Sequence, residues 1–360
     1  MQTRLSQAAT VACVSDLRPC LASDNWAGAH PAVMEAVAAA NVGSSPAYGA
    51  DVWTERAEHW FAEQFGADAK VFFVFGGTAA NVVSLQAILR PHRALITSDC
   101  AHVGVDECGA TERILGSKLL PLATREGKLT ADQVRMACQD LHVPHQIHPG
   151  AVSLTQSTEY GTLYRPDELA TITATARSQG LKVHMDGARI ANAAAALGCS
   201  LKAITRDVGI DVLSFGATKN GAMAAEAVVV FDAEIAEELP FIRMQSLQLS
   251  SKMRFLAAQF IALGDEHRWL TCARHANAMA GRLAAGLADL PDVRITQPVQ
   301  ANAVFVVIPP EATRALQQHA DFHVWDPNTG EVRLMTSWAT TPEEIDRFLE
   351  IAHGALTLGG

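Results

Sequence analysis

A lysine, an aspartate and a glycine pair each follow an apolar run in this sequence, and all three can carry chemistry. Lys219 stands among small residues in the stretch SFGATKNG. Asp186 ends the run LKVHMD, and Gly76 and Gly77 follow the run VFFVF. Ligands of open parallel sheets bind outside the carboxyl ends of the strands. We therefore expect these three groups to meet in one crevice.

Each group has a chemical interpretation and an ordinary structural alternative. Desolvation and positive neighbours make a lysine amine nucleophilic toward aldehydes, whereas most lysines lie in solvated loops. Asp186, with Arg189 three residues later, could face a ligand or could cap a helix. Gly77 and Thr78 could hold a phosphate at a helix N-terminus or could form a plain tight turn. Neither the Walker pattern nor GxGxxG is present at these glycines.

A phosphate cup, an acid and an amine along one sheet match the needs of pyridoxal 5′-phosphate (PLP). The phosphate of PLP binds helix N-terminal amides, its pyridine nitrogen pairs with a carboxylate, and its aldehyde forms a Schiff base with an amine. The glycine pair, Asp186 and Lys219 would supply these contacts in that order along the chain. The sequence therefore predicts PLP as the cofactor.

The elements that must position these groups are short strands that alternate with helices. Near-continuous apolar strands separated by helical patterns indicate an α/β fold, with a mostly parallel sheet covered by helices on both faces. Strands are expected at residues 71–75, 94–96, 151–155, 181–186, 212–215 and 227–231, and helices at 78–89 and 166–180.

The sequence after residue 250 has a different pattern, which predicts a second domain. Residues 251–290 are rich in Ala, Leu and Arg and have a helical pattern. Further strands are expected at 303–308, 322–325 and 331–337, and helices at 310–319 and 342–353. We expect an N-terminal arm at 1–20 that is not a signal peptide, a large PLP-binding domain at 21–250, and a small α+β domain at 251–360.

The overall composition is that of an ordinary globular protein, with 360 residues, 49% hydrophobic and 18% charged, and a formal net charge of -10. The charge is spread along the chain without a basic patch, which disfavours nucleic acid and anionic membranes as partners. Seven scattered cysteines form no CxxC pair, which disfavours a disulfide framework and fits a cytoplasmic protein. No run approaches about 18 apolar residues, so no membrane-spanning helix is expected.

Eight short motifs, in order along the chain, resemble those of a known family. They are SDN (23–25), AYGAD (47–51), GTAAN (77–81), AH (101–102), DECGA (106–110), HMDGAR (184–189), NA (192–193) and GATKNG (216–221). They resemble the motifs of the low-specificity L-threonine aldolases, in the β-eliminating lyase family of fold-type I PLP enzymes. The resemblance implies a large domain built on a mostly parallel seven-stranded sheet, and a small C-terminal α+β domain.

The resemblance also implies which residues bind the cofactor. Lys219 would form the Schiff base, and Asp186 would pair with the protonated pyridine nitrogen. His102 would stack on the ring, whereas the residues alone leave an ordinary polar loop histidine as the alternative. The remaining cofactor contacts would come from Gly77, Thr78, Thr218 and Arg189.

A substrate site beside the cofactor follows from the same resemblance. Arg189 and Arg333 would bind the substrate carboxylate, because a planar guanidinium meets a carboxylate with two hydrogen bonds. Arg333 alternates with apolar neighbours and so points away from their face, although a lone surface arginine is the alternative. Ser23 and Tyr48 would complete the substrate contacts.

The proton of the substrate hydroxyl needs a base, and histidines are the candidates. The resemblance implies His102, His142 or a water between them, with Glu107 supporting His102 or the hydroxyl. His142, His145 and His148 are spaced by three residues, which could suggest a metal site. Two prolines in this run break the helix that such a site would need, so no metal is expected.

The implied reaction is reversible cleavage of L-threonine, L-allo-threonine and related β-hydroxy-α-amino acids, such as phenylserine, to glycine and an aldehyde. The alternatives are another reaction of a fold-type I PLP enzyme, such as aminotransfer, racemisation or β-elimination, and a cofactor-free binding protein. A homodimer or homotetramer with sites between subunits is expected. Lys252 or Arg254 could supply the basic group that a neighbouring subunit gives to the phosphate.

Overall fold

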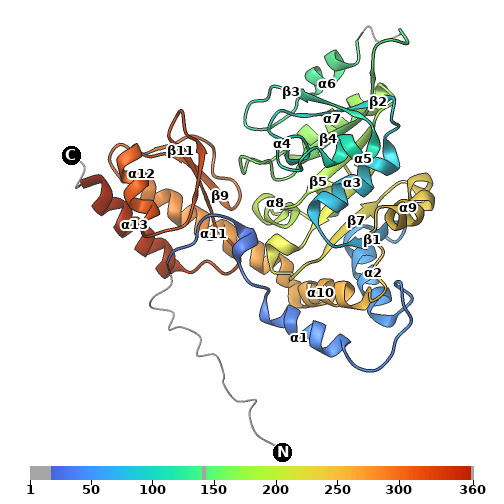
Figure 1. Ribbon diagram of the computed structural model, residues 1–360, viewed down its shortest axis with the longest axis horizontal. Coiled ribbons are helices and arrows are strands. Elements are labelled where there is room, and N and C mark those ends of the chain that lie inside the picture. Colours follow the sequence, from blue (N-terminus) through green and yellow to red (C-terminus); the bar gives the residue numbers. More distant parts are fainter. Residues whose placement is uncertain (1–17, 140–142, 358–360) are drawn as a thin grey trace, which may run out of the picture.

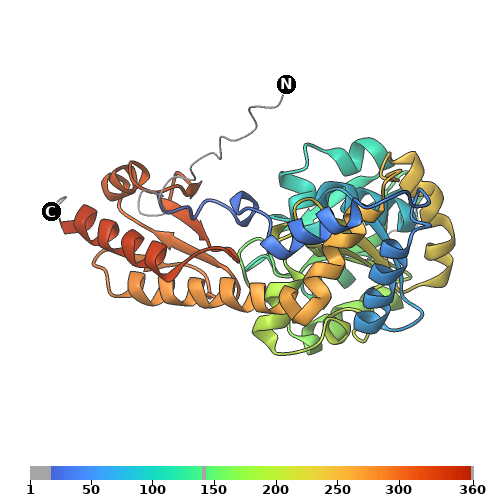
Figure 2. The ribbon, with the colours of Figure 1, turned by 90° about the horizontal axis from the view of Figure 1, so that it is seen from below.

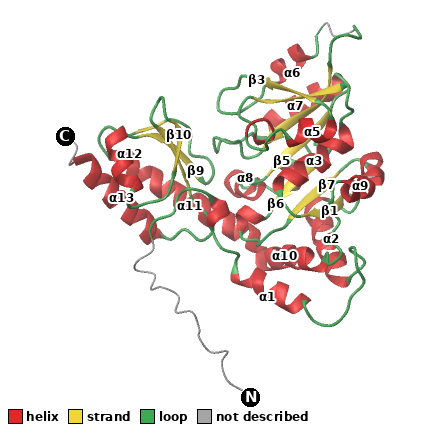
Figure 3. Cartoon of the chain, in the orientation of Figure 1, coloured by secondary structure: helices red, strands yellow, loops and turns green. Residues whose placement is uncertain are grey.

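The computed structural model describes residues 18–139 and 143–357 of the chain. These residues form a large unit and a small unit that lie side by side along the longest axis (Figure 1). A seven-stranded sheet runs through the large unit, and a four-stranded sheet forms the small one. Figure 3 shows helices on both faces of the large sheet and on one face of the small sheet.

The seven strands of the large sheet are arranged in the order β1-β7-β6-β5-β4-β2-β3. Their bounds are β1 Lys70–Val74, β2 Arg93–Ser98, β3 Lys118–Leu122, β4 His148–Thr155, β5 Lys182–Gly187, β6 Val212–Gly216 and β7 Glu226–Val230. Only β7 is antiparallel to its neighbours, so the predicted mostly parallel sheet is confirmed. Because of its reversed direction, β7 begins at the edge of the sheet where the other strands end.

Alternate residues of the central strands face two separate apolar cores. Val212 and Val228 pack with Val83 of one helical layer, whereas the adjacent residues Leu213 and Val229 belong to the core on the other face. This alternation is the two-residue period of a strand, and it requires helices on both faces.

The helices of the large unit lie close to their predicted positions wherever a prediction was made. They are α1 Pro31–Ala40, α2 Val52–Phe65, α3 Gly77–Ile88, α4 His102–Val105, α5 Ala110–Leu115, α6 Ala131–Ala137, α7 Pro166–Ser178, α8 Ile190–Leu197, α9 Ala233–Gln245 and α10 Arg254–Gly264. The start of α7 follows from its sequence, because Pro166 occupies the first turn and the Glu168 carboxylate accepts the N–H of Arg165.

The small unit contains an antiparallel sheet with the strand order β10-β11-β9-β8. Its elements are α11 Arg268–Ala288, β8 Arg294–Ile295, β9 Ala303–Val307, α12 Pro310–Gln317, β10 His323–Asp326, β11 Glu331–Met335 and α13 Pro342–Thr357. Its own core includes Leu283, Val304, Val332 and Phe348. Figure 2 shows α11 running from the large unit beneath the small sheet.

The arrangement of α10 and α11 bears on the predicted division into domains. α10 contacts α1 and α2 of the large unit, while α11 contacts α8 in the large unit and α13 in the small one. α10 therefore packs with the large unit, although the predicted boundary at 250 assigned it to the small domain. We propose two domains that meet near residue 265, with α11 joining them. Residues 1–17 of the predicted arm lie outside the described residues, and Cys20 forms a parallel β-bridge with Asp321.

In the two described stretches of the chain, none of the helices is both long enough and apolar enough to cross a lipid bilayer.

Candidate active site

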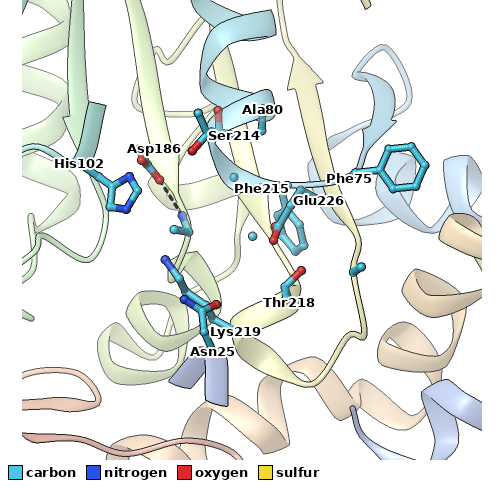
Figure 4. A pocket seen from close by; sticks show the side chains of 16 residues that line it. Asn25, Phe75, Ala80, His102, Asp186, Ser214, Phe215, Thr218, Lys219 and Glu226 are labelled. Atoms are coloured by element: carbon cyan, nitrogen blue, oxygen red, sulfur yellow. Dashed lines mark hydrogen bonds between the residues drawn. The ribbon is translucent and has the colours of Figure 1, made fainter. Parts of the chain in front are cut away.

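A cavity of about 290 Å³ lies at the edge of the large sheet where the parallel strands end. The structure brings six of the predicted site residues to its lining, namely Gly77, Thr78, His102, Asp186, Thr218 and Lys219. In Figure 4, the side chains of His102, Asp186 and Lys219 point toward the same space from three different segments.

One end of the cavity is formed by the start of α3. Gly76 is the N-cap of this twelve-residue helix, and no side chain caps its first turn. A Cβ atom added at Gly76 or Gly77 would meet nothing within 4 Å. The first-turn N–H groups therefore face open space, in the arrangement that suits a phosphate.

The carboxylate of Asp186 accepts one hydrogen bond from the turn after β5 and one from a side chain of α3. Its Oδ1 accepts the N–H of Ala188 at 2.9 Å, and its Oδ2 accepts the side-chain amide of Asn81 at 2.9 Å. It is not the N-cap of α8, a position that Arg189 occupies. Although burial raises the pKa of Asp186, the Asn81 hydrogen bond and the nearby charge of Lys219 hold that pKa below its usual value.

Lys219 lies in the 3-10 turn Thr218–Asn220, just after β6. Burial and the positive charge of Arg189 lower the pKa of Lys219, although nearby carboxylates oppose this shift. The strand reaches this turn through Gly216, where an added Cβ would lie 2.4 Å from the carbonyl oxygen of Ala188. Only glycine fits there, so the close approach of two backbone segments fixes the position of the lysine.

His102 is linked to Asp186 by a chain of hydrogen bonds. Its Nδ1 lies 2.9 Å from Oε1 of the buried Glu107. The same Oε1 accepts the side-chain amide of Asn81 at 2.8 Å, and Asn81 also donates to Asp186. The hydrogen bond to Glu107 raises the pKa of His102, although burial opposes it. The sequence motif includes Asn81, but no role was predicted for it.

Arg189 is held by a carboxylate that sequence reasoning did not assign. Its Nε and Nη2 donate to Oδ2 and Oδ1 of the buried Asp24 at 2.7 and 2.9 Å. The side-chain amide of Asn302 also donates to Asp24, at 3.0 Å. This bidentate pair leaves Nη1 of Arg189 outside the contact with Asp24. The only signal in the sequence was the position of Asp24 within the SDN motif.

Arg333 and Ser23 lie beside this pair, outside the cavity lining. The guanidinium carbon of Arg333 is 5.1 Å from the ring centroid of Trp325, and its Nε is buried without a hydrogen-bond partner. Burial and the charge of Arg189 lower the pKa of Arg333. The Ser23 hydroxyl accepts the N–H of Asn25 at 3.2 Å. Two neighbouring guanidinium groups with unused donors suit an anion such as a carboxylate.

Of the remaining predicted residues, those that the structure describes do not line the cavity. Tyr48 is 58% exposed and does not line it. His142 lies outside the described residues. Lys252 is exposed, and Arg254 is half-buried with an unpartnered Nε.

Glu226 lines the cavity and was missed by the sequence analysis. It is buried, and its Oε2 accepts the N–H of Ala217 at 2.8 Å. Burial raises the pKa of Glu226 to about 7, although its hydrogen bonds and the charge of Lys219 oppose this shift. The available signal was an acidic residue directly before the apolar run AVVVF.

Comparisons with known proteins show which family the chain matches. The chain matches the family model described as beta-eliminating lyase over residues 21–309. It is 45% identical over 335 residues to the low specificity L-threonine aldolase of Pseudomonas aeruginosa, which covers 92% of this chain and 95% of that protein.

Two solved structures resemble the fold. The threonine aldolase of Leishmania major superimposes with a TM-score of 0.89 and 29% identity, covering 94% of this chain and 99% of that one. Cystalysin of Treponema denticola, whose structure contains PLP, superimposes with a TM-score of 0.70 and 11% identity, covering 92% and 89% of the two chains.

Proposed function

This chain belongs to the beta-eliminating lyase family, and on that premise we propose that it is a PLP-dependent threonine aldolase, an aldehyde-lyase. It would cleave L-threonine, L-allo-threonine and related β-hydroxy-α-amino acids reversibly to glycine and an aldehyde. The observation that carries the proposal is the shared cavity of Lys219, Asp186 and the uncapped start of α3.

The residues around the cavity fit PLP in chemical type. Lys219 supplies an amine whose pKa is lowered by burial, and Asp186 supplies a buried carboxylate held ionised by an amide. Gly77 and Thr78 would hold the phosphate, together with the Thr218 hydroxyl. When bound, the cofactor supplies an aldehyde for the substrate amine and an electron-withdrawing ring that accepts the electron pair of the broken Cα–Cβ bond.

The other side chains would orient the substrate and move its proton. Arg189 and Arg333 would hold the substrate carboxylate, which would fix the rotation of the substrate about Cα and so select the bond that breaks. His102 would lie against the ring and take the hydroxyl proton at Nε2, because its Nδ1 is engaged by Glu107. His142 stays a second candidate base, and Ser23 and Tyr48 stay candidate substrate contacts.

The test is product analysis with five substrates. L-threonine, L-allo-threonine, the two D-isomers and phenylserine are incubated with the purified protein, and glycine and aldehyde are measured. We expect acetaldehyde and glycine from the L-isomers and benzaldehyde from phenylserine. Lys219→Ala should abolish aldehyde release, whereas Lys202→Ala, on the surface, should not. A keto acid or a racemised product without aldehyde would contradict the proposal and favour another fold-type I reaction.

The proposal extends to a homodimer or homotetramer in the cytoplasm. Apolar side chains are exposed near the cavity, including Phe75 at 45% and Met223 at 48%. A neighbouring subunit would cover them and bring its Tyr48, and Lys252 or Arg254, to the site. The cysteines at the described positions are unpaired, which fits a reducing compartment.

A further inference from the structure

Glu226 lies between the two ends of the proposed cofactor site. It is the first residue of β7 and pairs with Val74 at the end of β1 and with Gly216 at the end of β6. β1 leads into the glycine pair and α3, and β6 leads into the turn with Lys219. The antiparallel direction of β7 therefore places a carboxyl group between the helix N-terminus and the lysine.

This carboxyl group shares the cavity lining with the predicted phosphate ligands Gly77, Thr78 and Thr218. Oε2 accepts the N–H of Ala217 at 2.8 Å. The Thr218 hydroxyl accepts the N–H of Ala225 at 3.2 Å and lies 3.5 Å from the carbonyl oxygen of Ala225. Figure 4 shows this hydroxyl oxygen facing the carboxyl group of Glu226. An ionised carboxylate would compete with a phosphate for this hydroxyl.

A phosphate dianion and an ionised Glu226 would also repel each other. Among the described residues that line the cavity, the other titratable groups are His102, Asp186 and Lys219. The charge of Lys219 favours the ionised form of Glu226. Burial of the carboxyl group has a larger effect in the opposite direction and raises its pKa. An arriving anion disfavours that form further, because like charges at short range cannot both ionise easily.

We propose that Glu226 is a phosphate-binding residue that takes up a proton when the cofactor binds and donates it in a hydrogen bond to a phosphate oxygen. The proton comes from solvent and goes to Oε1, while Oε2 continues to accept the N–H of Ala217. The Thr218 hydroxyl would donate to the phosphate while it still accepts the N–H of Ala225. A carboxylic acid that faces an anionic oxygen forms a short and strong hydrogen bond. This inference rests on the proposed function, because it takes the phosphate of PLP as the ligand.

The experiment counts protons during binding to the full chain freed of cofactor. Calorimetry in two buffers of different ionisation enthalpy is performed at about pH 8, where a phosphate monoester with a second pKa of about 6 is fully ionised. PLP and inorganic phosphate alone are the two ligands, and wild type is compared with Glu226→Gln. The exposed Glu63→Gln serves as the matched control.

The proposal predicts that wild type and Glu63→Gln take up close to one proton more than Glu226→Gln with either ligand. Above neutral pH, the Kd for PLP should rise by up to about tenfold per pH unit more in wild type than in Glu226→Gln. Infrared difference spectra of wild type should show a new protonated-carboxyl band when phosphate binds. This last measurement decides the question even if Glu226→Gln does not fold.

Equal proton counts in wild type and Glu226→Gln would overturn the inference, and so would the absence of the carboxyl band. Attachment of PLP to Lys219 is followed separately, by borohydride reduction and mass analysis. If PLP attaches and the proton counts are equal, the inference fails alone. If PLP does not attach at all, the proposed function fails and the inference fails with it.

Discussion

The side-chain amide nitrogen of Asn81 lies 2.9 Å from Oδ2 of Asp186. The same nitrogen lies 2.8 Å from Oε1 of Glu107, so one amide uses both of its hydrogens on two buried carboxylates. Glu107 in turn holds Nδ1 of His102. The residue proposed to pair with the pyridine nitrogen is thereby coupled to the residue proposed to stack on the ring.

Replacing Asn81 tests this coupling. Asn81→Ala removes the donor from both carboxylates, which should lower the free energy of unfolding by about 1–3 kcal/mol. It should also shift the pH at which the absorbance of the bound cofactor changes, since Asp186 and Glu107 lose a stabilising partner. Spectrophotometric pH titration measures this shift. Asn277→Ala, a half-buried asparagine outside the cavity, should leave the titration unchanged, and an unchanged titration in Asn81→Ala would contradict the coupling.

The pair Arg189–Asp24 predicts an effect on substrate affinity. Asp24→Asn breaks the buried bidentate contact with Arg189. Arg189 should then lose the fixed orientation in which it is proposed to bind the substrate carboxylate. We expect KM for L-threonine to rise by about tenfold or more, with a smaller loss of kcat. Asp68→Asn is the matched control, because Asp68 pairs with Arg206 on the surface and such pairs contribute little. A KM that changes equally in both variants would refute this role for Asp24.

His184 predicts how stability depends on pH. Its Nδ1 and Nε2 lie 2.8 and 2.9 Å from the hydroxyls of Ser153 and Ser214, and its side chain is fully buried. Burial lowers the pKa of His184 from its usual 6.5, although Asp186 opposes this shift. His184 therefore takes up a proton more readily in the unfolded chain than in the folded chain. Its contribution to the free energy of unfolding is present above the pKa of histidine in the unfolded chain and is lost as pH falls below that value.

The expected loss is up to about 1.4 kcal/mol per pH unit below about pH 6.5. Chemical unfolding at a series of pH values measures it. In His184→Gln the free energy of unfolding should fall less steeply with decreasing pH than in wild type, because glutamine cannot be protonated at this position. The control His59→Gln removes a side chain that is 77% exposed and should retain the wild-type slope. If the free energy of unfolding fell equally steeply with pH in His184→Gln and in wild type, this source of pH dependence would be ruled out.

The ring of Trp325 stacks on the guanidinium group of Arg333, and we expect this contact to affect substrate binding. The tryptophan ring covers the guanidinium group and packs against Phe305 and Tyr160. Trp325→Leu should raise KM by several-fold, because Arg333 would no longer be held in one orientation. Trp53→Leu removes a similar contact with Arg56, 5.3 Å from that ring, and should leave KM unchanged. Steady-state kinetics with L-threonine compares the two variants, and equal KM values would contradict the role of Trp325.

Most strands could be predicted from the sequence, and so could the cavity-lining residues Asp186 and Lys219, because both depend on local patterns. The apolar runs marked β5 and β6, and the residues that follow them gave Asp186 and Lys219. β3 was not predicted, since its sequence KLLPL contains a proline and is short. The partner of Arg189 was also missed, because Asp24 lies 165 residues earlier and only tertiary packing brings the two together.

Glu226 was missed for a topological reason. A residue at the start of a strand would lie at the far edge of a fully parallel sheet, away from the ligand. Only the reversed direction of β7 brings it to the cavity, and an apolar run does not reveal its direction. The burial that perturbs the pKa of this group is likewise a property of the assembled sheet.

Asp24 joins three parts of the chain at one carboxylate. It belongs to the segment before α1, it holds Arg189 from the large unit, and it accepts Asn302 from the small unit. A change in the angle between the two units would therefore alter the position of Asp24 and, with it, the orientation of Arg189. Residues far from the cavity therefore offer positions at which the preference for the substrate side chain could be engineered. Substitutions at the contact between Tyr160 and Phe305, which joins the two units, would test whether the arginines proposed to bind the carboxylate can be re-aimed without altering the cavity lining.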